Sequence, residues 1–112
     1  KDQWCWRLMI RTPEFIAARD LEQAVAALLK RGKDEEVRRV RLEKLVEGRC
    51  VQMLHVGPYE RECESVALMA AFAQKQGLSF HGRHHEIYFS DPRRVAPEKL
   101  KTIVRQPVVQ RG

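Results

Sequence analysis

The stretch from Arg83 to Thr102 constrains the fold of this chain more than any other part of it. Residues 85–89 read His-Glu-Ile-Tyr-Phe, and this alternation of polar and apolar side chains predicts a strand. The Asp and Pro of residues 90–92 then predict a turn. Glu86 and Tyr88 fall on the same face of the strand, which is either an exposed polar face or the floor of a pocket, and the residues alone leave both open.

The rest of the chain shows two further kinds of periodicity. A period of two predicts strands, and apolar residues at i, i+4 and i+7 predict amphipathic helices. The predicted strands are 4–10, 37–45, 50–56 and 103–109, with Pro107 at an edge or a strand end, and the predicted helices are 18–30 and 62–76. These elements predict an α+β fold with an antiparallel sheet and helices packed on one face. They form one strand-strand-helix-strand-strand repeat plus a preceding strand and a linking helix.

Length and charge limit the kinds of partner. A chain of 112 residues is long enough for one domain with a modest core. The 21 basic and 15 acidic residues give a net charge of +6, but the basic residues are mostly scattered. There is no helix-turn-helix, zinc-finger or basic-zipper pattern, so we expect no specific nucleic-acid partner.

The cysteines and the hydropathy pattern indicate the compartment. Three cysteines form no Cys-x-x-Cys pair, which argues against a disulfide framework and favours the reducing cytoplasm. No apolar run approaches the roughly 20 residues that a membrane-spanning helix needs, so we expect no membrane partner. The chain begins at Lys1 rather than Met, and we therefore expect it to be part of a longer protein.

The histidines do not predict a metal site. His84 and His85 are adjacent on a predicted strand and so face opposite sides, which prevents them from easily binding one ion. His55 precedes a Gly-Pro turn, and we interpret it as a hydrogen-bonded structural residue. We expect neither a metal nor another cofactor.

Two motifs, in this order, resemble the GyrI-like small-molecule-binding family. The first is His-Val-Gly-Pro-Tyr at 55–59; the second is His-His-Glu-Ile-Tyr-Phe-Ser-Asp-Pro-Arg-Arg at 84–94, followed by Ala-Pro-Glu-Lys-Leu-Lys-Thr at 96–102. Residues 43–108 resemble one full repeat, and residues 4–13 resemble the final strand of a preceding repeat. The resemblance is greatest to the branch that contains cyclopropane-opening hydrolases.

The resemblance implies a domain organisation. Residues 1–42 are expected to hold the last strand of a truncated first repeat, the linking helix and a connector, and residues 43–112 the complete second repeat. Family domains are built of two repeats. We therefore expect the absent repeat, or a second copy of the chain in a homodimer, to be a partner.

The resemblance also implies a function. We expect the sheet face opposite the helices to bind a small, flat, largely apolar or cationic ligand through Glu86, Tyr88, Trp4 and Trp6. In the hydrolase branch the same pocket opens an electrophilic cyclopropane ring of DNA-alkylating toxins, which would make Glu86 and Tyr88 catalytic, with Glu86 as a general base on water. A third alternative is a gyrase-inhibitor-like protein-binding module. The residues leave open whether the protein is an enzyme.

Overall fold

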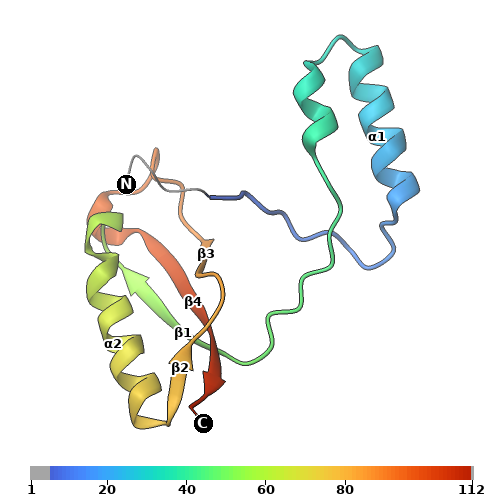
Figure 1. The fold of residues 1–112 in the computed structure, drawn as a ribbon. Coiled ribbons are helices and arrows are strands. Elements are labelled where there is room, and N and C mark those ends of the chain that lie inside the picture. Colours follow the sequence, from blue (N-terminus) through green and yellow to red (C-terminus); the bar gives the residue numbers. More distant parts are fainter. Residues whose placement is uncertain (1–5, 112) are drawn as a thin grey trace. The chain divides into compact units, whose positions relative to one another are not determined.

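The computed structural model describes residues 6–111, and the chain divides into two compact units, residues 1–45 and 46–112. Figure 1 shows the elements of each unit. Neither described α-helix, of 13 and 14 residues, combines the length and apolar character that crossing a membrane requires.

The first unit is organised around helix α1, Ala18–Lys30, whose bounds match the predicted helix. The helix begins where the carboxylate of Asp20 accepts the N–H of Ala17 at 2.7 Å, which satisfies one of the free donors of the first turn. It ends before Gly32, whose φ of 82° is the left-handed conformation that glycine adopts readily.

A short 3₁₀ helix, η1, Glu35–Arg39, follows in the first unit, and the strand predicted at 37–45 is therefore wrong. Arg38 and Arg39 pair with the glutamates three residues before them at 2.6 and 3.0 Å, a spacing that favours a helical turn. The predicted strand at 4–10 is also wrong for its described part, since residues 6–10 form no strand. A strand needs a neighbour for its N–H and C=O groups, and residues 6–45 contain no other strand.

The second unit is a four-stranded antiparallel sheet with one helix on one face, which confirms the predicted fold class. Its elements are β1 Cys50–Val56, η2 Tyr59–Arg61, α2 Glu62–Lys75, β2 Leu78–Phe80, β3 His85–Tyr88, η3 Pro97–Lys99 and β4 Lys101–Gln110. The long strand β4 is central: β1 pairs with one side of it, and β2 and β3 share the other side. Strand β2 was not predicted.

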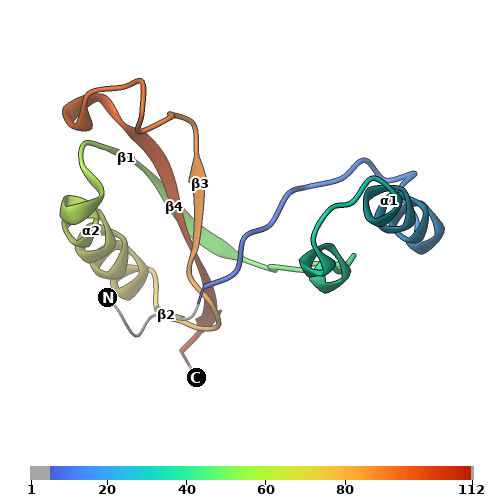
Figure 2. The same cartoon turned by 90° about the horizontal axis from the view of Figure 1, so that it is seen from above.

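The core lies between α2 and alternate residues of β4. Thr102 and Val104 are fully buried, and Val108 is nearly so. Met69 and Ala73 of α2 are buried as well, and α2 lies along the sheet face that we call the helix-covered face (Figures 1 and 2). The opposite side of the sheet in this unit is called the open face below.

Pro107 lies within the central strand, towards its end, at a position where the ladder is interrupted. Its carbonyl accepts the N–H of His81 at 2.9 Å, so its own nitrogen also points at the bend between β2 and β3. Because no ladder hydrogen bond is needed from that nitrogen, a proline is tolerated there. Gln106 stabilises the bend by donating its Nε2–H groups to the carbonyls of His81 and Gly82 at 3.1 and 3.3 Å.

Candidate functional site

The strand register places the predicted site residues on the helix-covered face. Glu86 pairs with Val104 and Tyr88 with Thr102, and both partners are buried residues of that face. Because neighbouring residues in register share a face, Glu86 and Tyr88 project from the same side of the sheet as α2. The expectation that they lie opposite the helices is therefore wrong. Alternation indicates that two residues share a face, but it does not indicate which face a helix will cover.

Glu86 is held by two donors from its own strand region. The hydroxyl of Tyr88 donates to Oε1 at 2.7 Å, and Nε2–H of His84 donates to Oε2 at 3.0 Å. The hydrogen bond from His84 lowers the pKa of Glu86, and those from Tyr88 and Glu62 add to this, while burial opposes them. Glu86 is therefore ionised near neutral pH, although only 21% of its side chain is exposed.

Two tyrosines border this carboxylate. The rings of Tyr59 and Tyr88 meet edge to face, with centroids 5.8 Å apart. Burial and the hydrogen bond to Glu86 raise the pKa of Tyr88, so its hydroxyl keeps its proton as a donor. Tyr88 is nevertheless 56% exposed, which leaves part of its ring available to a flat ligand.

A second carboxyl belongs to the same group. Glu62 opens α2, immediately after the turn that contains Tyr59. Burial raises the pKa of Glu62 most, and the negative charge of Glu86 raises it further. The residues that converge here, which we call the acid–tyrosine cluster, are Tyr59, Glu62, His84, Glu86 and Tyr88.

Sequence reasoning missed Glu62 as a site residue and treated it only as an acid at the positive end of a helix. Its side chain meets a strand that lies more than twenty residues further along the chain, and no local periodicity encodes such a contact. Its position three residues after Tyr59, the last residue of the first motif, is a signal that could have identified it.

His55 has the predicted structural role. It is buried, and its Nε2–H donates to the carbonyl of Pro58 at 3.0 Å, since a carbonyl can only accept. In the neutral ring Nδ1 then accepts the hydroxyl proton of Ser65, at 2.8 Å. His55 thereby ties β1 to the turn and to α2, and it holds the segment that carries Tyr59 and Glu62.

The two tryptophans predicted to bind the ligand both fall within residues 1–45. Trp4 lies outside the described residues, and Trp6 is a residue of the first unit, where it is 75% exposed. Their role in ligand binding stays a prediction.

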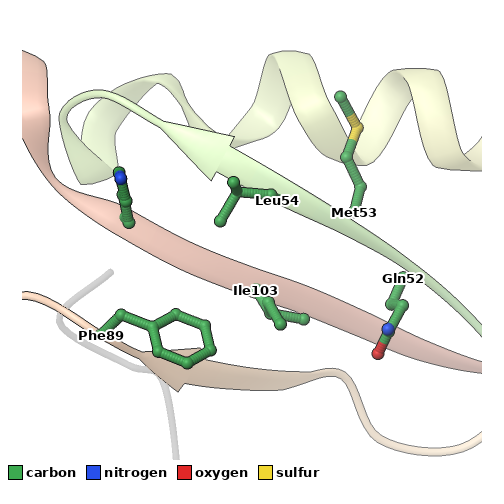
Figure 3. Close-up of a pocket in the computed structure, with 6 residues that line it drawn as sticks. Gln52, Met53, Leu54, Phe89 and Ile103 are labelled. Carbon is green, nitrogen blue, oxygen red and sulfur yellow. The ribbon is translucent and has the colours of Figure 1, made fainter.

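The open face carries a different kind of surface. A hollow of about 430 Å³ lies on it. Figure 3 shows Leu54, Phe89 and Ile103 among the residues that line this hollow. Its lining is mainly apolar and contains Lys101 but no carboxylate. The open face thus offers a hollow, whereas the acid–tyrosine cluster offers charge and hydrogen-bonding groups. The hollow has few groups that could orient a polar ligand.

The described residues contain no group of three or more His, Cys, Asp or Glu side chains arranged to hold a metal ion. The acid–tyrosine cluster itself offers charge, hydrogen bonds and aromatic surface. It can attract a cation, stack a flat ring, or exchange protons through its carboxyl groups.

Comparison with known proteins gives consistent results. The family model of the GyrI-like small molecule binding domain matches residues 5–109. Three solved structures from Listeria innocua are similar. One is described as a hydrolase (43% identity, TM-score 0.83, 88% of this chain and 52% of that one), one as an uncharacterized conserved protein (46%, 0.83, 88% and 50%) and one as a hydrolase (44%, 0.81, 88% and 50%). The chain thus spans about half the length of these relatives. No curated protein matches significantly.

Proposed function

Because the chain belongs to the family of GyrI-like small molecule binding domains, we propose that it binds a small, flat, largely apolar or cationic molecule against Glu86 and Tyr88. The observation that supports this most is the state of Glu86: its carboxylate is ionised and mostly shielded from water beside a tyrosine ring. A partly desolvated negative charge attracts a cation more strongly than one in bulk water.

The two residues contribute different parts of the recognition. Glu86 supplies charge, and its two donors fix the direction in which its oxygens point. Tyr88 supplies a partly exposed ring, and aromatic faces favour both flat apolar molecules and cations. A ligand that is both flat and positively charged satisfies both residues at once.

Replacing Glu86 with Gln tests this proposal, because Glu86→Gln keeps the shape and removes the charge. We expect affinity for a flat cationic dye to fall by about 1.5 to 3 kcal/mol, roughly ten- to a hundredfold. Calorimetric titration of a panel of such dyes, with an uncharged flat analogue, measures the effect. Glu64→Gln is the matched control, since it removes one negative charge at a residue outside the acid–tyrosine cluster: Glu64 lies in the first turn of α2 and is 60% exposed.

Equal dye affinity in the wild type and in Glu86→Gln would remove Glu86 from the binding site. A loss of the same size in Glu64→Gln would show that only the net charge of the protein matters.

Hydrolysis is the second candidate, and it is favoured by the description of two of the similar Listeria innocua structures as hydrolases. In this proposal Glu86 takes a proton from a water whose oxygen bonds to a ring carbon of an electrophilic cyclopropane, and the C–C bond of the ring breaks, leaving its electron pair as the developing anion. The hydroxyl of Tyr88, which donates to Glu86 in the structure, would turn to donate to that anion. A raised pKa was expected for such a base; the pKa of Glu86 is instead lowered, first by the hydrogen bond from His84, which keeps the carboxylate ionised but makes it a weaker base.

The same variant separates the two functions. For a hydrolase, Glu86→Gln should retain most of the affinity for a neutral cyclopropane substrate, while turnover falls about 10²- to 10⁴-fold. Chromatographic detection of the ring-opened product measures turnover. Binding of that substrate without any product from the wild type would leave only the binding function.

We also propose that a second copy of the chain, or a second repeat of a longer chain, covers the open face. Leu54 and Phe89 are 49% and 62% exposed there, and they flank the apolar hollow. The match covers only about half of each similar structure, which supports a two-repeat arrangement.

A further inference from the structure

The carboxyl group of Glu62 is in an unusual position for a charged side chain. Its Oε2 atom is buried, and among the described residues it accepts no hydrogen bond. A buried oxygen left unpaired is costly, and more so when it is charged. A proton on this carboxyl removes the charge and gives the group a hydrogen to donate.

Glu86 is the acceptor that such a proton needs. After burial, the charge of Glu86 is the largest cause that raises the pKa of Glu62, and an interaction with the side chain of Glu62 lowers the pKa of Glu86 less than the hydrogen bond from His84 does. An ionised carboxylate can only accept hydrogen bonds. A hydrogen bond between two carboxyl groups therefore requires that one of them holds a proton.

The surroundings decide which of the two holds it. Glu86 already accepts hydrogen bonds from His84 and Tyr88, and these stabilise its ionised form. Glu62 lacks such donors, and burial together with the charge of Glu86 disfavours its ionisation, although His55 and His84 oppose this.

The other elements around the pair add little that changes this balance. Strand β4 contributes the uncharged Thr102 and Val104 to this face, and η2 contributes Tyr59. Burial raises the pKa of Tyr59, so it remains a neutral phenol.

We propose that Glu62 and Glu86 form an acid pair that shares one proton, held on Glu62, so that the site presents a single negative charge to its ligand. This inference rests on the proposed function, because it concerns the ligand that Glu86 binds. Glu62 is then a residue that sets specificity: the singly protonated pair carries one negative charge, which matches a singly charged cation.

The pair also predicts that the affinity for a cation increases as the pH rises. At low pH Glu62 is neutral and one charge faces the ligand. As the pH rises through the raised pKa of Glu62, a second negative charge appears, and affinity for a cation increases. The affinity of an uncharged ligand is expected to change little.

The variant Glu62→Gln mimics a neutral Glu62, because the amide is uncharged and can still donate a hydrogen bond to Glu86. At a pH below the raised pKa of Glu62, where the pair holds its proton, we expect affinity for a flat monovalent dye within about threefold of the wild type. As the pH rises through that pKa, we expect the wild type to bind the dye more tightly and Glu62→Gln to show a flatter profile. A tenfold or greater loss at the lower pH in the well-folded variant would overturn the proposal.

A titration without ligand tests the pair independently of the proposed function. The side-chain carbon resonances of ¹³C-labelled glutamates are followed against pH in the wild type, and Glu62 is assigned by its absence in Glu62→Gln. We expect Glu62 to ionise at higher pH in the folded chain than in the urea-unfolded chain. Ionisation at the same pH in both would overturn the acid pair, whereas the expected shift without any dye binding would refute only the proposed function.

Discussion

At the scale of single residues, His55 positions the acid–tyrosine cluster although it is not a member of that cluster. Its two hydrogen bonds fix the carbonyl of Pro58 and the hydroxyl of Ser65, on either side of Tyr59 and Glu62. The geometry of the cluster therefore depends on a buried side chain in β1 as well as on β3.

Replacing His55 with Ala is expected to destabilise the protein by about 2 to 4 kcal/mol, because two hydrogen bonds are lost and a cavity remains. Urea denaturation measures the change. His81→Ala is the control, since His81 is exposed and its described hydrogen bonds use its backbone. An equal, small effect in the two variants would contradict the structural role of His55.

The sequence predicted part of this site. The period-two pattern of residues 85–89 predicted that Glu86 and Tyr88 share a face, and the Gly-Pro turn predicted the role of His55. It did not predict the contact with Glu62, because that contact depends on how α2 lies on the sheet. It also could not determine the face, since each face of the strand satisfies the same alternation.

At the scale of elements, the bend between β2 and β3 is stabilised by a side chain of the central strand. Gln106 is 6% exposed and donates to two backbone carbonyls of the bend, those of His81 and Gly82. A buried amide in a strand is tolerated here because the bend leaves carbonyls that no ladder satisfies.

Gln106→Leu is expected to cost about 1 to 3 kcal/mol, because the carbonyls of the bend lose their donor. Hydrogen exchange followed by mass spectrometry should show faster exchange in peptides covering residues 78–84, with little change in β1. Gln74→Leu on the exposed side of α2 is the control. Unchanged exchange around His81 would show that its N–H bond to Pro107 is sufficient.

Elements with strong local signals were predicted well, and those that depend on a distant partner were not. The apolar stripe predicted the helix at 18–30 where α1 lies, and β1, α2 and β4 were predicted within a few residues. Residues 37–45 have strand-forming side chains, but the ion pairs of η1 favour a helical turn and the first unit offers no strand to pair with them.

At the scale of the whole molecule, the open face of the second unit raises the question of assembly. Leu54 projects from it beside the hollow that Figure 3 shows. If a second copy covers this face, a charge at its centre should prevent association, because an unpaired buried charge is costly.

Leu54→Lys is therefore expected to shift the mass measured by light scattering from dimer to monomer, while circular dichroism stays unchanged. Leu68→Lys is the matched control, since Leu68 lies on α2 and is 59% exposed, compared with 49% for Leu54. A wild type that stays monomeric at high concentration would contradict the homodimer.

The interruption opposite Pro107 also affects how the protein resists fibril formation. Long, flat outer strands act as templates on which further chains stack, and short or bent ones do not. Beyond β4, one side of the sheet ends in strands of three and four residues separated by a bend, while the other ends in β1, with seven. Cross-β growth from the folded sheet should therefore start at β1. Mutations that straighten the bend between β2 and β3 should allow such growth at the opposite edge as well.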